Sequence, residues 1–196
     1  MFYTLRNLFA LVGLIAIAAI IYAAIKLEPA YRVFQSFDDK ALDVYTEMGQ
    51  KLIETGNMAE ATVWKRQVEG GLSAAEVEEV MKFVANEHNI KNVGELPLYQ
   101  EIKAMSGEDH RYVKIFMFCN AMTASRMMAY SDAFSAYLPC RVSMLEDNDG
   151  NLWLYTLNMD GMIYGGTPLP PALKEEALGV KTIILDIINR GATGEF

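Results

Sequence analysis

Residues Tyr112–Phe118 read YVKIFMF, a nearly continuous run of apolar and aromatic side chains. Such a run is typical of a central strand that is buried in a sheet. Two further strands are predicted on its carboxyl side, at Cys140–Leu145 and Leu152–Leu157. Between them, Asn148–Gly150 (NDG) predicts a tight turn, because Asp-Gly readily adopts the positive φ angles of a hairpin. The last two strands are therefore expected to pair antiparallel.

A helix is predicted on the amino side of this run and another near the end of the chain. Ser73 and Glu76 form a capping-box pattern at the start of a helix that we expect to reach His88. Its apolar residues recur at helical spacing: Val77, Val80, Met81 and Val84. Pro170–Pro171 opens the last helix, which Gly191 ends.

The remaining segments complete the order of elements. Strands are predicted at 61–68 and 90–96, and helices at 98–105 and 121–137. This order predicts an α+β or α/β sandwich with one mixed β-sheet, and we adopt the α+β class. The helices at 73–88 and 171–190 are expected to cover the sheet.

The segment Asn7–Ile25 reads NLFALVGLIAIAAIIYAAI, without a charge or a proline. As a helix it would span roughly 28 Å, close to the thickness of a bilayer's hydrocarbon core. It exceeds the roughly 7–15 apolar residues of a signal peptide. The cleavage-like pattern Ala16–Ala18 lies in mid-run, where cleavage would leave an apolar stub. We therefore expect a retained transmembrane helix that contacts the lipid bilayer through residues 7–25.

The chain divides into three predicted parts. Residues 1–27 form the anchor, 28–58 a linker with an amphipathic helix, and 59–196 the α+β domain, with Pro29 breaking or bending the path after the anchor. The positive-inside rule does not fix the orientation, because Arg6 and the amino terminus on one side balance Lys26 and Arg32 on the other. We adopt the commoner arrangement, with the soluble domain on the periplasmic or extracellular side of the cytoplasmic membrane.

The composition excludes several classes of function. The chain has 17 basic and 25 acidic side chains, and its first 26 residues hold two of the basic and none of the acidic ones. The remainder thus carries a formal charge of −10 without a basic cluster, which argues against a nucleic-acid partner. Two cysteines and two histidines leave little room for a catalytic metal centre. No phosphate-binding glycine loop occurs either, and we expect no cofactor.

The segment from Phe118 to Asn158 resembles the bacterial and archaeal family called domain of unknown function 302. The resemblance rests on Phe118–Ala121 (FCNA), Leu138–Val142 (LPCRV) and the hairpin Glu146–Leu154 (EDNDGNLWL), and the closing helix also agrees. It covers roughly residues 61–190 and implies a compact α+β domain. Because the family's activity is unassigned, the resemblance implies no catalytic residues.

Cys140 and Arg141 are the candidate catalytic residues. If the guanidinium of Arg141 lies near the sulfur of Cys140, it would lower the thiol pKa and favour the reactive thiolate. The alternative, which we prefer, is that Cys140 is a small buried side chain at the start of a core strand.

Cys119 could in principle form a disulfide with Cys140. A helix of about 17 residues between them would run roughly 25 Å along the sheet and place the two cysteines at opposite edges. We therefore expect no bond between them. A kink near Ser131–Asp132 would bring them together instead.

Two weaker candidates remain. Met117, Cys119 and Met122 are closely spaced soft ligands that would suit Cu(I), although methionine is also a common filler of irregular cores and we prefer that interpretation. His110 could act as an acid, a base or a haem ligand, but no partner is placed near it by spacing, so we expect a surface residue.

The preferred hypothesis is a membrane-anchored binding or accessory module without enzymatic activity. We expect it to be a subunit or partner of a membrane complex in respiration or sulfur handling, and self-association into a homo-oligomer is compatible with it. The alternative is a thiol-dependent redox or sulfur-handling protein that uses Cys140, followed by a Cu(I)-binding protein.

Overall fold

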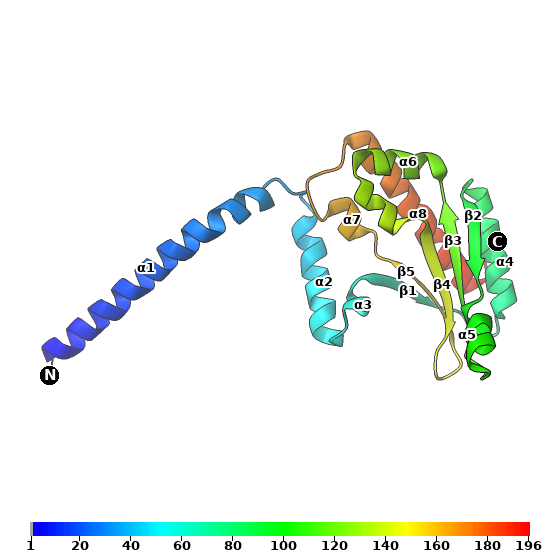
Figure 1. Ribbon diagram of the computed structural model, residues 1–196, viewed down its shortest axis with the longest axis horizontal. Helices are drawn as coiled ribbons and strands as arrows, with labels where there is room; N and C mark the ends of the chain where they lie inside the picture. The colour runs from blue at the N-terminus through cyan, green and yellow to red at the C-terminus, as the bar shows by residue number, and fades with distance from the viewer. Residues whose placement is uncertain (1) are drawn as a thin grey trace.

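A single five-stranded sheet organises the carboxyl-terminal part of the chain (Figure 1). The computed structural model describes residues 2–196. The strands are β1 (Val63–Gln67), β2 (Lys91–Leu96), β3 (Val113–Cys119), β4 (Cys140–Glu146) and β5 (Leu152–Leu157). Their order across the sheet is β1-β5-β4-β3-β2, and every neighbouring pair is antiparallel. The α+β class is confirmed, and the sheet is antiparallel throughout rather than mixed.

The reason for this difference lies between β3 and β4. The single helix expected over 121–137 is broken into α6 (Ala121–Tyr130) and a 3-10 helix, η1 (Asp132–Tyr137). Ser131 between them has an extended backbone, so the chain turns back before it has crossed the sheet. Strand β4 consequently begins beside the end of β3, with Cys140 opposite Phe118, and the two strands pair antiparallel.

Helices α4 (Ala74–Glu87) and α8 (Pro171–Thr193) pack against each other and cover one face of the sheet, as predicted (Figure 1). The expected capping box is present at the start of α4. The backbone N–H of Glu76 donates to Ser73 Oγ at 3.3 Å, and the backbone N–H of Ser73 donates to Glu76 Oε2 at 2.8 Å. Two shorter helices complete the domain: α5 (Leu98–Ser106) and α7 (Asp160–Tyr164).

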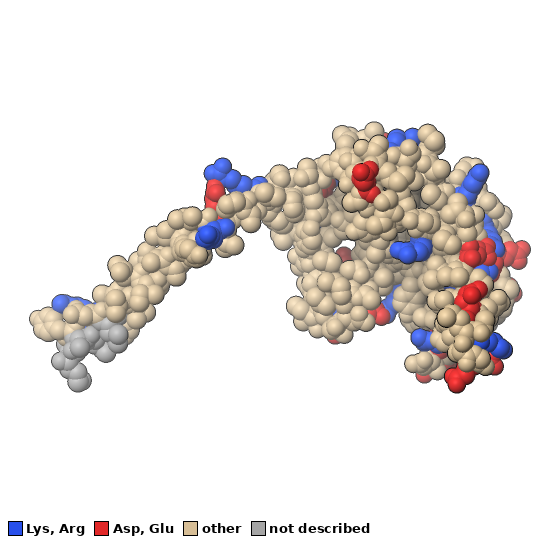
Figure 2. Space-filling model, in the orientation of Figure 1, with Lys and Arg blue, Asp and Glu red and all other residues tan. Residues whose placement is uncertain are grey.

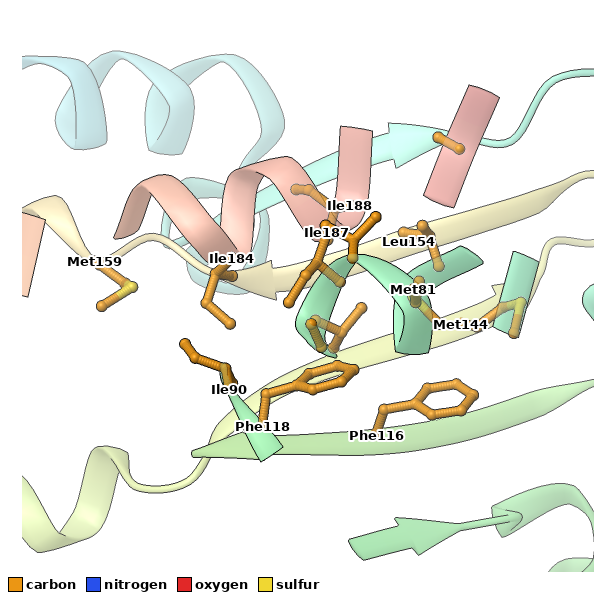
Figure 3. Close-up of a cluster of buried hydrophobic side chains, with 14 of the residues drawn as sticks. Met81, Ile90, Phe116, Phe118, Met144, Leu154, Met159, Ile184, Ile187 and Ile188 are labelled. Carbon is orange, nitrogen blue, oxygen red and sulfur yellow. The ribbon is translucent and has the colours of Figure 1, made fainter. Parts of the chain in front are cut away.

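The core lies between the sheet and the helices α4 and α8 (Figure 3). Alternate strand residues point toward these helices and are fully buried: Phe116, Phe118, Val142, Met144 and Leu154. Met81 from α4 and Ile184, Ile187 and Ile188 from α8 meet them (Figure 3). The period-two pattern of the strands therefore decides which side chains form the core and which face outward.

Two glycines of α8 test how closely this core is packed. A Cβ on Gly191 would lie 2.7 Å from Met81 Cγ and 3.2 Å from Leu154 Cδ1, whereas a Cβ on Gly179 would meet no atom within 4 Å. We expect Gly191→Ala to lower the free energy of unfolding by about 1–3 kcal/mol, because buried Met81 has no room to move. Gly179→Ala, the matched control, is expected to raise it by roughly 0.5–1 kcal/mol through helix propensity. Urea denaturation measures both, and equal effects would show that α8 does not pack this closely.

The amino-terminal part consists of α1 (Phe2–Phe34), α2 (Ala41–Thr55) and α3 (Met58–Ala61). Residues 9–34 of α1 include an 18-residue stretch whose mean hydropathy is 2.4 and none of whose residues is buried inside the molecule, so this helix is long and apolar enough to cross a membrane. Its middle carries no charged side chain, and charges gather toward its two ends (Figure 2).

Of the two expectations for Pro29, a break in the helix is wrong, because α1 continues through Pro29 to Phe34. Proline lacks one N–H donor, but its fixed φ angle is that of a helix. The ion pair between Glu28 and Arg32, four residues apart, links the turns on either side of it.

Helix α2 is attached to the domain rather than free. The backbone N–H of Asp38 donates to the carbonyl of Gly166 at 2.8 Å, and the buried carboxylate of Asp38 pairs with Lys174 of α8. The hydroxyl of Tyr45 donates to the carbonyl of Gly165. These contacts place α2 beside α7, on the side of the domain where α1 joins (Figure 1).

Candidate functional site

Cys140 and Arg141 are neighbours in β4, but their side chains do not come together. Cys140 is opposite Phe118 and lies on the helix-covered side of the sheet, while Arg141 is opposite Met117 and is exposed on the other side. Burial raises the pKa of the Cys140 thiol to about 11, and the nearby Cys119 adds to this shift. The thiol is therefore protonated at neutral pH, which argues against a reactive thiolate.

The argument that Cys119 and Cys140 lie at opposite edges of the sheet is wrong. Cys119 ends β3 one residue beyond Phe118, the register partner of Cys140, so both cysteines lie at the same end of adjacent strands. The break at Ser131 produces this arrangement, because it shortens the helix that was expected to carry the chain away. Both cysteines are free thiols in this structure.

The candidate copper ligands are divided between two elements. Met117 and Cys119 lie on the same face of β3, as their spacing predicts, and Met122 lies on the first turn of α6 with 65% of its surface exposed. Within residues 2–196, no three or more His, Cys, Asp or Glu side chains gather in a group that could hold a metal ion.

His110 lies in the exposed segment before β3, at the end of that strand far from Cys119. Its Nδ1 is 2.8 Å from the carbonyl oxygen of its neighbour Arg111. The structure places no other candidate site residue beside it. The other histidine is His88. Its Nε2 atom lies 2.8 Å from Oδ2 of Asp186 on α8, and this contact connects the end of α4 to α8.

A groove lies on the face of the sheet that α4 and α8 do not cover. Its volume is about 320 Å³. We call it the sheet groove, and it is lined by Val63, Ile115, Tyr137, Cys140, Arg141, Ser143, Tyr155, Thr156, Leu157, Met159 and Met162. Ligand sites in proteins commonly have volumes of about 300–1,000 Å³, so the sheet groove is large enough for a small molecule.

The local sequence explains why the sheet is hollow here. Ser143 of β4 lies directly between Ile115 of β3 and Tyr155 of β5, so a small side chain is flanked by two large ones. The end of the groove is walled by Tyr137 of η1 and by Met159 and Met162 beside β5. The broken helix after β3 thus supplies one wall, and the turn into α7 supplies another.

The polar groups of the groove are few. Thr156 donates its hydroxyl to the carbonyl oxygen of Arg141 at 2.8 Å, which ties β5 to β4 at the groove floor. Arg141 is the one cation in the lining given above, which contains no carboxylate. None of the ion pairs among residues 2–196 includes Arg141. Its guanidinium is therefore available to an anion.

A second, almost wholly apolar cavity lies on the helix-covered side, between α6, α8 and the end of β3. Its volume is about 40 Å³, which is room for only a few water molecules. Cys140, Tyr137 and Met162 line both this cavity and the sheet groove. We therefore take the sheet groove as the candidate ligand site and this cavity as a small packing defect beside it.

Sequence reasoning identified Cys140 and Arg141 but missed their surroundings. Ser143, Tyr155 and Tyr137 belong to three different elements, and only the antiparallel register places them together. One signal was available. In a strand that begins at Cys140, residues 141, 143 and 145 share a face, so a small polar residue and a cation could have been assigned to the side away from the core.

Comparison with known proteins agrees with this fold. The family model described as Domain of unknown function DUF302 matches residues 64–190. A crystal structure of an uncharacterized conserved protein DUF302 from Bacillus stearothermophilus is similar to this chain, with a TM-score of 0.54 and 17% sequence identity. The similarity covers 66% of this chain and 97% of that chain. No curated protein matches the sequence. The extent of the family match shows that this chain belongs to the DUF302 family, whose domain has no assigned function.

Proposed function

We propose that this protein is a membrane-tethered binding module that takes a small, largely apolar molecule into the sheet groove. The observation that carries the proposal is the groove itself, about 320 Å³ in volume and lined mainly by apolar side chains with a few polar ones. Binding sites for small molecules usually have this mixture, because apolar walls supply affinity and a few polar groups fix orientation.

The position of the groove supports a role near the membrane. Met159 and Met162, which line it, belong to or adjoin α7, and α7 contacts α2. Helix α2 follows the apolar helix α1 after a link of six residues, 35–40. If α1 spans the bilayer, the groove is held close to the surface from which α1 emerges, and a molecule that partitions near that surface would reach it readily.

The thiol-based alternative receives less support from the geometry. The raised pKa of Cys140 keeps the thiol protonated, and Arg141 is on the opposite face of β4. Cys140 instead contributes to the wall of the groove. We propose a binding role without a covalent step.

Photolabelling tests the proposal with the full-length protein in nanodiscs of zwitterionic lipid. The probe is a medium-chain aliphatic alcohol that carries a diazirine, and peptide mapping locates the label. We expect labelled peptides from β4, β5 and α7. Ser143→Trp is expected to reduce this labelling at least tenfold, because the indole fills the space between Ile115 and Tyr155.

Gln67→Trp is the matched control, because Gln67 is exposed on the same face of the sheet but does not line the groove. Circular dichroism confirms that both variants fold. Labelling confined to α1, or labelling that is equal in wild type and both variants, would show that the groove does not bind the probe.

A further inference from the structure

We infer that the ligand of the sheet groove is an amphipathic anion, with one carboxylate or phosphate on a short apolar body, and that Arg141 binds its charged end. This inference rests on the proposed function, because it names the class of molecule that the groove takes. It makes Arg141 a ligand-binding residue and not a catalytic one.

The first argument is the charge of the lining. Arg141 is its one cation, no Asp or Glu lies among the lining residues, and no carboxylate elsewhere in residues 2–196 pairs with it. Other exposed cations, such as Lys91 and Arg111, also lack an acidic partner among these residues, but Arg141 is the one that lines the groove. A guanidinium offers several N–H donors in a planar fork that matches a carboxylate or phosphate.

The second argument is the arrangement of polar and apolar residues. Arg141 lies on the face of β4 that also carries Ser143, whose hydroxyl can donate to a second oxygen of the same anion. Tyr155 of β5 lies opposite Ser143, and the apolar lining beyond it includes Ile115 from β3 and Val63 and Leu157 from a paired row of β1 and β5. An anionic end beside Arg141 and an apolar body across these side chains would satisfy both parts of the lining.

The third argument excludes other charge classes. A cationic ligand would meet Arg141 and no compensating carboxylate, which is unfavourable at short range. A neutral apolar ligand would leave the guanidinium without a partner and would remove water from it, a cost that an anion avoids. The lining therefore favours anionic ligands over cationic and neutral ones.

Competition against the photoreactive alcohol probe, in nanodiscs of zwitterionic lipid, tests the inference. The competitors are octanoate, octyl phosphate, octanol and octylamine. We expect octanoate and octyl phosphate to displace the probe at concentrations about tenfold lower than octanol does, and octylamine to be the weakest. In Arg141→Gln the advantage of the anions is expected to disappear while displacement by octanol is unchanged.

Two variants serve as controls. Arg141→Lys keeps the charge and is expected to retain part of the preference for anions. Arg111→Gln removes an exposed cation that lies outside the groove and hydrogen-bonds Asn148 near the hairpin, so it should leave the preference intact. Higher salt should weaken displacement by the anions and not by octanol.

The outcomes separate this inference from the proposed function. If the probe labels the groove but octanoate competes no better than octanol, or if Arg141→Gln weakens both equally, the inference is overturned and the binding module stands. If the probe does not label the groove at all, the proposed function itself is wrong.

Nanodiscs with added anionic phospholipid distinguish the source of the anion. Suppressed labelling there assigns the site to a lipid headgroup, and unchanged labelling assigns it to a free amphipathic acid, and either result supports the inference.

Discussion

Removal of residues 1–34 is expected to transfer the protein from the membrane fraction to the soluble fraction while the α+β domain stays folded. Residues 9–34 of α1 contribute no buried side chain to the domain, so their loss removes none of the core. Each Leu, Ile, Phe or Val near the centre of such a helix favours membrane insertion by roughly 0.3–0.6 kcal/mol, and the run contains many of them. Ultracentrifugation and circular dichroism of the residue 35–196 chain measure the two parts of this expectation.

A full-length variant provides the matched control. Replacing Ile15 and Ala18 by arginine puts two charges in the middle of α1, each of which opposes insertion by about 2.5–3.5 kcal/mol. This variant is expected to leave the membrane fraction although its length is unchanged. A truncated chain that still sediments with membranes would show that another surface holds the protein there.

The structure of the domain supports its independence from α1. The fold shared with the similar DUF302 protein from Bacillus stearothermophilus accounts for 97% of that chain and 66% of this one. Helix α2 differs from α1 in this respect, because Asp38 and Tyr45 join it to the carbonyl groups of Gly166 and Gly165. The truncation point is therefore placed after Phe34, so that these contacts remain.

The sequence predicted the elements of the domain well, because their patterns are local. The apolar run before Cys119, the turn at Asn148–Gly150 and the capping box at Ser73 each depend on residues that are close in the chain, and each is present. The boundaries of the strands agree within two residues. The short helices α3 and α7 were not predicted, since four or five residues carry too little periodicity to be recognised.

The sheet topology and the site could not be predicted in the same way. Whether β4 runs parallel or antiparallel to β3 depends on one extended residue, Ser131, within an otherwise helical pattern. That residue also decides whether Cys119 and Cys140 are near each other and whether Tyr137 reaches the sheet groove. The backbone at one residue therefore controls several long-range contacts. A short stretch of sequence does not show which contacts will form.

The second large effect is expected from Lys114→Met, which should lower the free energy of unfolding at pH 7 by about 2–3 kcal/mol. Lys114 Nζ lies 2.7 Å from Glu78 Oε2 and 2.7 Å from Glu95 Oε2, and only 15% of its side chain is exposed. Without Lys114, the partly buried carboxylates of Glu78 and Glu95 would have Lys82 as their one remaining cationic partner. Urea denaturation measures the loss. Lys103→Met is the matched control, because Lys103 and its partner Asp109 are largely exposed, and it should cost less than about 1 kcal/mol.

The pH dependence of this loss distinguishes a charge effect from a packing effect. Burial alone would raise the pKa of Glu95, but hydrogen bonds from Lys114, Lys82 and Asn92 lower it to about 2, below the ordinary value of 4.5. A carboxyl whose pKa is lower in the folded state stabilises the protein above pH 4.5, and this contribution is lost as the pH falls toward 2. In Lys114→Met the burial remains while one donor is gone, so the pKa of Glu95 rises and less stability is left to lose in acid. The difference in free energy of unfolding between wild type and Lys114→Met should therefore shrink from pH 5 to pH 2. A difference that stays constant over this range would mean that Lys114 acts through its contact with the Phe116 ring and not through its ion pairs with Glu78 and Glu95.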